Sequence, residues 1–118
     1  MAISFEDDGA RRLTALVDGQ PAGRIDYFVL PGGAEPEHRP SALVGVHTEV
    51  DPEHQGRGVA GALAAEFYRL AAAGGRAVVP LCPYLKKWAE AHPDQAPAVD
   101  TELVRDAARH LRQDPSLW

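Results

Sequence analysis

The chain has 118 residues, of which 45% are hydrophobic, so it is long enough to bury the core of one domain. Its 17 acidic and 12 basic residues give a formal net charge of −5. This charge argues against a nucleic-acid or anionic-membrane surface, because contacts to phosphates dominate binding to both. The single cysteine, Cys82, excludes an internal disulfide and a thiolate zinc cluster.

Residues 1–8 contain neither the basic segment nor the apolar core of a signal peptide. No run of the sequence approaches the roughly 20 apolar residues that cross a bilayer. We therefore expect a cytoplasmic protein with no membrane partner.

An antiparallel hairpin is predicted near the start. Apolar and polar residues alternate over residues 11–18, the period of a half-buried strand. Turn-forming residues 18–21 connect this segment to a second alternating segment, residues 22–30. Residues 31–40 are rich in proline and glycine and predict an exposed loop.

The middle of the chain predicts a strand, a helix and a second strand. Residues 43–50 alternate with a period of two, and Pro52 ends this strand by removing a backbone donor. The helix that follows ends at Gly74-Gly75, before a strand at 77–81. Its apolar residues recur at helical spacing: Val59, Leu63, Phe67, Leu70 and Ala71. This order predicts a right-handed crossover between two parallel strands.

Two more helices are predicted in the C-terminal third. Residues 83–92 form the first, which Pro93 stops. Its inward residues are Leu85, Trp88 and Ala89. Asp100 or Thr101 caps the second. Its apolar stripe consists of Leu103, Val104, Ala107, Ala108 and Leu111. This tail either covers the sheet or lies against a second subunit in a homodimer.

Glycines at 56, 58 and 61 lie where the central strand passes into its helix, and they weaken a helix unless the backbone needs close approach. The unpaired N–H groups and partial positive charge of a helix start suit a phosphate, and Arg57 adds a fixed charge. Residues 56–61 spell the dinucleotide motif G-x-G-x-x-G. Five residues nevertheless separate strand from glycine, no acidic residue ends the next strand, and the chain is too short for a doubly wound sheet.

A second motif begins one residue earlier. Residues 55–60, Gln-Gly-Arg-Gly-Val-Ala, fit Q/R-x-x-G-x-G/A. With His47-Thr48-Glu49-Val50-x-Pro52 before this motif and Val79-Pro80-Leu81-Cys82-Pro83-Tyr84 after it, the chain resembles a small single-domain subfamily of the GNAT superfamily of N-acetyltransferases. The match runs over residues 42–93.

The resemblance implies a GNAT-like acyl-CoA N-acyltransferase fold, an α/β (α+β) domain with a mixed sheet over residues 1–118. Residues 42–93 would be its cofactor-binding core and residues 97–118 a C-terminal helical extension. The two parallel strands would splay apart near Pro80 to admit the pantetheine arm of acetyl-CoA. The residues that would bind acetyl-CoA are Val50, Gln55, Gly56, Arg57, Gly58, Val59, Ala60 and Cys82.

His47 and Glu49 are candidates for the catalytic base. They are two residues apart on one strand, so their side chains point to the same face, just before the proposed cofactor turn. Either one is placed to take a proton from an acceptor ammonium, directly or through water. In the alternative interpretation neither residue is catalytic: His47 is a hydrogen-bonded, half-buried histidine, and Glu49 is a solvated glutamate. Together with Asp51 and His54 they lack a spacing that fixes a coordination sphere, so no metal site is expected.

Cys82 ends a strand and precedes a helix, whose dipole favours the thiolate. The resemblance places this cysteine and His47 near the acetyl group. Cys82 would then be a covalent acetyl carrier, a proton donor to the CoA thiolate, or a small apolar wall. Tyr84 is a second candidate for the proton donor, and the alternative for Tyr84 is simple aromatic packing.

We predict an acetyl-CoA-dependent N-acetyltransferase in which the amine attacks directly within a ternary complex. The acceptor is a small-molecule amine, a polyamine or a protein lysine. The alternative from another class is a non-catalytic acetyl-CoA sensor or adaptor that keeps the cofactor turn and lacks an acceptor pocket. In a third alternative the glycine turn is purely structural.

Overall fold

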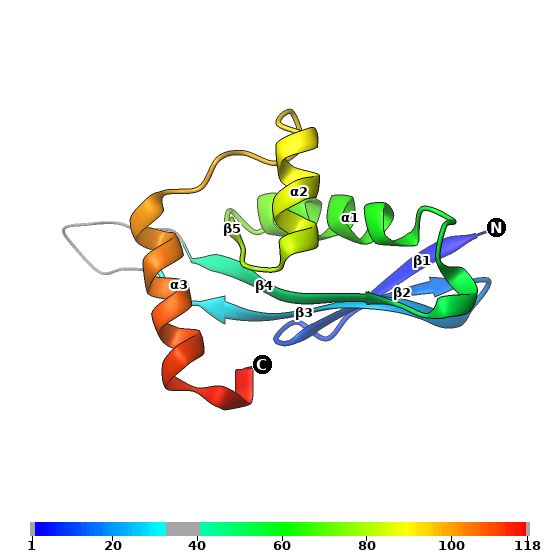
Figure 1. The fold of residues 1–118 in the computed structure, drawn as a ribbon, viewed down its shortest axis with the longest axis horizontal. Helices are drawn as coiled ribbons and strands as arrows, with labels where there is room; N and C mark the ends of the chain where they lie inside the picture. Colours follow the sequence, from blue (N-terminus) through cyan, green and yellow to red (C-terminus); the bar gives the residue numbers. More distant parts are fainter. Residues whose placement is uncertain (1, 33–40, 118) are drawn as a thin grey trace.

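The computed structural model describes residues 2–32 and 41–117, which form a five-stranded mixed sheet with helices on both faces (Figure 1). The strands lie in the order of the chain: β1 Ile3–Asp7, β2 Arg12–Val17, β3 Gln20–Leu30, β4 Ala42–Val50 and β5 Ala77–Pro80. The first four strands pair antiparallel with one another, and β5 pairs parallel with β4. The predicted mixed sheet, hairpin and parallel crossover are confirmed. The loop predicted at 31–40 lies largely outside the described residues.

Three α-helices follow β4: α1 Val59–Ala73, α2 Pro83–Ala91 and α3 Thr101–Gln113. Short 3-10 helices lie at Pro52–His54 and Pro115–Leu117. The boundaries match those predicted to within a few residues. Asp100 caps α3, because its carboxylate accepts a hydrogen bond from the Glu102 N–H at 2.8 Å. None of these helices is both long and apolar enough to span a membrane, within the residues described.

The strand β1 was not predicted. It pairs with β2 from Ile3↔Val17 to Asp7↔Leu13, and its two apolar side chains pack at the edge of the core. Ile3 and Phe5 alone are too short an alternation to indicate a strand. The neighbouring strand holds it in place, and the Tyr27 hydroxyl donates a hydrogen bond to Asp7 at 2.5 Å.

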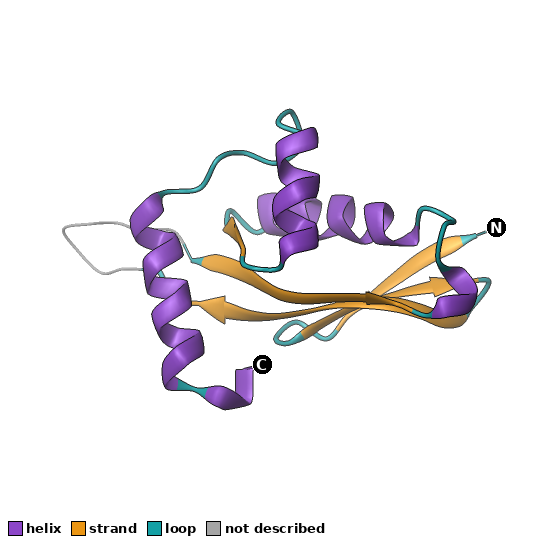
Figure 2. Cartoon of the chain, viewed as in Figure 1, coloured by secondary structure: helices purple, strands orange, loops and turns teal. Residues whose placement is uncertain are grey.

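Two apolar clusters lie on opposite faces of the sheet. Adjacent strand residues alternate between them: Tyr27 belongs to the first cluster and Phe28 to the second, and Leu43 and Val44 divide in the same way. The helices α1 and α2 cover the first cluster, and α3 covers the second (Figure 2). The C-terminal helix therefore packs on its own sheet.

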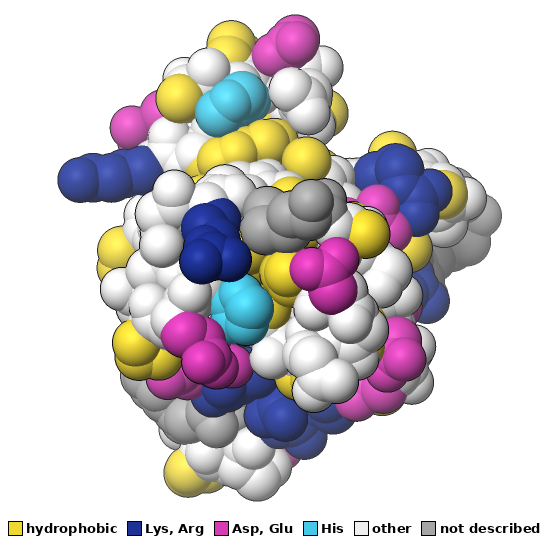
Figure 3. Space-filling model, turned by 90° about the vertical axis from the view of Figure 1, so that its right-hand side faces the viewer, with side chains coloured by type: hydrophobic (Ala, Val, Ile, Leu, Met, Phe, Trp, Pro, Cys, Tyr) yellow, Lys and Arg dark blue, Asp and Glu magenta, His cyan; other side chains and the backbone are white. Residues whose placement is uncertain are grey.

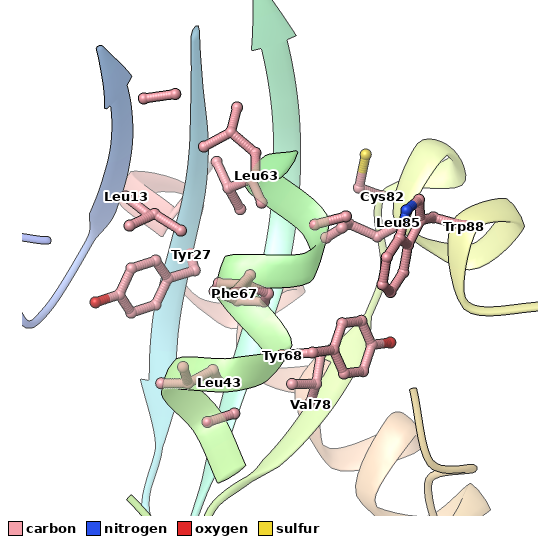
Figure 4. Packing of buried hydrophobic residues seen from close by; sticks show 14 of the residues in the cluster. Leu13, Tyr27, Leu43, Leu63, Phe67, Tyr68, Val78, Cys82, Leu85 and Trp88 are labelled. Carbon is pink, nitrogen blue, oxygen red and sulfur yellow. The ribbon is translucent and has the colours of Figure 1, made fainter. Parts of the chain in front are cut away.

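Phe67 of α1 is the largest fully buried side chain in the structure, and it lies over the strands between Tyr27 and Leu43 (Figure 4). The rings of Tyr27 and Phe67 meet edge to face, with centroids 5.4 Å apart. Gly45 of β4 lies beneath this packing. A Cβ at Gly45 would overlap Leu85 Cδ1 and approach Phe67 Cε2 to 3.2 Å, so only glycine lets both helices sit close to the strand.

The sheet changes its pairing in the middle of β4. Asp26 pairs with His47 while Tyr27 pairs with Gly45, so Val46 is the extra residue of a β-bulge. The pairing of β4 with β5 ends at Gly45↔Pro80, where the backbone N–H groups of Leu81 and Cys82 both donate to the Gly45 carbonyl, at 3.0 and 3.1 Å. From there β4 continues to Val50, and among the described residues β3 is the one strand that pairs with it.

Candidate functional site

The turn after β4 is held in place by hydrogen bonds to the neighbouring strands. The Asp51 N–H donates to the Ala22 carbonyl at 2.8 Å, and the 3-10 turn begins directly afterwards. The Gln55 side chain donates from Nε2 to the Val50 carbonyl at 3.1 Å. Of the predicted cofactor residues, Gln55 and Val50 are thus joined by a hydrogen bond that holds the turn in shape.

Gly56 and Gly58 adopt left-handed backbone conformations, with φ values of 79° and 81°. A Cβ at either position would meet nothing within 4 Å, so the turn borders open space. Gly58 is the N-cap of α1 and offers no side chain to the free N–H groups of the first turn. Within the described chain, no hydrogen-bond acceptor engages the N–H of Gly56, Arg57 or Gly58.

The other predicted cofactor residues lie around this turn. Arg57 is exposed and makes no ion pair with a described residue, so its charge is available to a ligand. Val59 is buried and anchors the start of α1, whereas Ala60 is half-buried. The turn lies at the end of the molecule that faces the viewer in Figure 3, where acidic, basic and histidine side chains are interspersed. This arrangement of unpaired N–H groups and one free guanidinium suits a phosphate group.

His47 and Glu49 lie on the face of the sheet away from α1 and α2. The bulge at Val46 places His47 opposite Asp26, which alternates with the core residue Ile25. The side chains of His47 and Glu49 are 56% and 52% exposed, and His47 Nε2 lies 3.6 Å from Glu49 Oε2. The prediction that they share one face is confirmed.

Cys82 lies on the other face of the sheet. It is 5% exposed and packs beside Leu85 and Trp88 at the start of α2 (Figure 4). Its sulfur lies 3.5 Å from the hydroxyl of Thr48, the residue between His47 and Glu49. Thr48 was not predicted as a site residue. Its contact with Cys82 comes from the fold, because the two residues are 34 positions apart.

Tyr84 points toward the start of α1. A Cβ at Gly61 would lie 3.8 Å from both the Tyr84 hydroxyl and Trp88 Nε1, so these two donors converge on the first turn of that helix. Desolvation and the nearby Cys82 raise the pKa of Tyr84, which therefore stays protonated at neutral pH. Tyr84 is 37% exposed and accessible to a ligand.

The four predicted catalytic residues therefore fall into two groups. His47 and Glu49 lie on one face of the sheet, and Cys82 and Tyr84 lie on the helical face. The two groups lie on either side of the segment of β4 after Gly45, where the pairing with β5 has ended. Across residues 2–32 and 41–117, no three His, Cys, Asp or Glu side chains converge on a point where they could hold a metal ion.

A family model described as GCN5-related N-acetyl-transferase matches residues 12–98. A ribosomal-protein-alanine N-acetyltransferase from Brucella melitensis biovar Abortus 2308 is 28% identical, over 80% of this chain and 66% of its own, with a TM-score of 0.57. An aminoglycoside acetyltransferase from an uncultured soil metagenomic sample is 22% identical, over 81% of this chain and 64% of its own, with a TM-score of 0.54. The chain thus spans about two thirds of each structure's length. No curated protein sequence matches it. The fold expected from the resemblance is confirmed.

Proposed function

Because the chain belongs to the GCN5-related N-acetyltransferase family, we propose that it transfers the acetyl group of acetyl-CoA to an amine, which attacks the thioester directly while both substrates are bound. One observation carries this proposal. The end of β4, which pairs with β3 but not with β5, is followed by an open glycine turn and has a different set of proton-transfer groups on each face. A two-substrate reaction needs such a site, with one approach for each substrate.

The turn from Gln55 to Ala60 is the proposed binding site for the pyrophosphate of acetyl-CoA. Gly56 and Gly58 leave the backbone open to an anion, and the N–H groups at the start of α1 donate to it. Arg57 adds a positive charge. When bound, acetyl-CoA supplies an acetyl group activated as a thioester, and the sulfur is the leaving group.

His47 is the proposed base. Glu49 already forms an ion pair with Arg24, whose Nη2 lies 2.7 Å from Glu49 Oε2, so its carboxylate is less available to act as a base. The imidazole of His47 is free to take a proton from the acceptor ammonium, and Glu49 then stabilises the imidazolium at 3.6 Å. The amine nitrogen forms the new bond to the acetyl carbon as the carbon–sulfur bond breaks, and the nitrogen loses its second proton to solvent as the amide forms.

Tyr84 is the proposed proton donor to the leaving thiolate. It is accessible, it stays protonated at neutral pH, and its hydroxyl lies by the first turn of α1. Cys82 is buried and its sulfur is hydrogen-bonded to the Thr48 hydroxyl, so we assign it to the wall of the acetyl pocket. The acceptor approaches from the His47 face and the donor from the Cys82 face.

The test is release of free CoA from acetyl-CoA, with a panel that holds aminoglycosides, polyamines, lysine peptides and peptides with an N-terminal alanine. At least one class should be acetylated, and His47→Gln should lower kcat/KM at pH 7 by about a hundredfold or more, the usual share of a general base. His110→Gln, a change at an exposed histidine of α3, is the matched control and should retain activity.

Two outcomes would contradict the proposal. Tight binding of acetyl-CoA without transfer to any amine would favour a sensor or adaptor. A His47→Gln variant with the wild-type rate from pH 6 to 9 would remove this histidine from the mechanism.

A further inference from the structure

Five charged or titratable side chains form a continuous row across three strands, on the face that carries His47. We call Arg12, Asp26, Arg24, Glu49 and His47 the charge row. Arg12 Nε lies 2.8 Å from Asp26 Oδ1, and Arg24 Nε lies 3.1 Å from Asp26 Oδ2. Arg24 Nη2 lies 2.7 Å from Glu49 Oε2, and the same oxygen lies 3.6 Å from His47 Nε2. From Arg12 to Glu49 the charges alternate in sign along the row, and His47 follows at its end.

The register of the strands builds this row. Arg12 is directly opposite Asp26 across β2 and β3, and Arg24 is directly opposite Glu49 across β3 and β4. His47 joins it because the bulge at Val46 sets His47 opposite Asp26. Opposite charges at such cross-strand positions attract one another.

Arg24 is the member that bridges two carboxylates. Its Nε serves Asp26 and its Nη2 serves Glu49, so both edges of its guanidinium are used. Partial burial lowers the pKa of Arg24, but the hydrogen bonds and charges of Asp26 and Glu49 outweigh this effect and raise it. The positive charge next to Glu49 is therefore permanent.

We propose that Arg24 is a positioning residue for the acetyl transfer: it holds the Glu49 carboxylate beside His47 and limits how strongly that carboxylate stabilises the imidazolium. The inference rests on the proposed function, in which His47 is the base. Because Arg24 and His47 share one oxygen of Glu49, each weakens the pull of that oxygen on the other. With Arg24 in place, part of the negative charge of Glu49 is neutralised, so Glu49 stabilises the protonated imidazole less than it would alone.

Three charged or titratable side chains near His47 or on this face have partners of their own. Asp26, directly opposite His47, is held by both Arg12 and Arg24. From α3, His110 stacks on Phe28, with ring centroids 6.4 Å apart, and Phe28 lies two residues beyond Asp26 on the same face. Arg12 ends the row farthest from His47 and contacts only Asp26 among these groups. It offers a matched ion pair that does not touch Glu49.

The experiment compares the pH dependence of kcat/KM in the wild type, Arg24→Gln, Arg24→Lys and Arg12→Gln. Without Arg24, the Glu49 carboxylate interacts with His47 alone and stabilises its protonated form more strongly. The acidic limb of the Arg24→Gln profile should therefore move to higher pH by about half a unit. Arg24→Lys should show a smaller shift than Arg24→Gln, since lysine keeps the charge but cannot bind both carboxylates with two edges of a guanidinium. Arg12→Gln should leave the limb in place. Superimposable limbs for the wild type and Arg24→Gln, or an equal shift in Arg12→Gln, would overturn the inference.

A second readout separates this inference from the proposed function. The ring protons of His47, identified by their absence from the NMR spectrum of His47→Gln, report the titration of that side chain without any substrate. The midpoint should rise in Arg24→Gln and stay unchanged in Arg12→Gln. If no amine is acetylated while the midpoint shifts, the proposed function fails and the coupling stands. If acetylation proceeds and depends on His47 while the midpoint is unmoved, the role of Arg24 fails.

Discussion

At the scale of single residues, Cys82 is the site candidate whose role the geometry constrains most. It is 5% exposed and lies against Thr48, among the apolar side chains of α2. A covalent acetyl carrier needs an accessible thiolate, whereas a residue that only lines the acetyl pocket needs no more than a small side chain. We therefore expect Cys82→Ala to keep kcat within about tenfold of the wild type, with no acetylated enzyme by mass spectrometry. Tyr84→Phe, which removes the proposed proton donor, should lose more, about a hundredfold.

A covalent route predicts the opposite result for this pair of variants. A trapped acetyl-enzyme in the wild type, with almost no turnover in Cys82→Ala, would show that the acetyl group passes through the sulfur.

The sequence was sufficient to identify His47 and Glu49 as neighbours on one face, because residues two apart in a strand always share a face. It was not sufficient to say which face. A single bulge residue, Val46, reverses the direction of every side chain after it, and that bulge depends on pairing with β3. The role of Arg24 could not be predicted either, because its contact with Glu49 depends on the pairing of two different strands.

At the scale of secondary-structure elements, α1 has two glycines with positive φ, one at each end. Gly58 precedes the helix with φ 81°, and Gly75 follows it with φ 68°. Neither has a neighbour within 4 Å of a built Cβ, so alanine at either site brings backbone strain of about 1 kcal/mol without a clash. Both variants should lose that much stability in thermal denaturation. In calorimetry, Gly58→Ala alone should weaken acetyl-CoA binding, by about tenfold or more.

This comparison separates a binding role from a conformational one. Equal acetyl-CoA affinity in Gly58→Ala and Gly75→Ala would mean that the turn before α1 does not bind the cofactor.

Most elements could be predicted because their patterns are local. The stripe of α1 follows from apolar residues at helical spacing, and the start of α3 follows from its capping residue Asp100. The strand β1 could not be predicted in this way, since Ile3 and Phe5 form a strand only when β2 is beside them. Contacts distant in sequence decide such short elements.

At the scale of the whole molecule, helices cover one face of the sheet and only part of the other. The helices α1 and α2 cover one face, and α3 covers the part of the other face around Phe28 and Val44. The part of that second face beyond the bulge, which holds His47, is left exposed. The family match ends at residue 98, before α3, so the helix that covers this second face lies outside the matched segment.

The end of β4 has a further consequence for how the protein behaves in solution. From Val46 to Val50 this strand pairs with β3 on one side, and no strand of residues 2–32 or 41–117 pairs with it on the other. Such an edge is a template on which an extended segment of another molecule can add by backbone hydrogen bonding. The amides of the pantetheine arm would occupy the same edge, so the cofactor would act as a shield against self-association.

We therefore expect the protein without acetyl-CoA to aggregate faster during mild heating than the protein saturated with it, as measured by light scattering. NAD at the same concentration is the control and should give no protection. Equal aggregation rates with and without bound acetyl-CoA would show that this edge is not the vulnerable one. The interruption in the sheet that is proposed to admit acetyl-CoA would thus also govern how readily the protein self-associates.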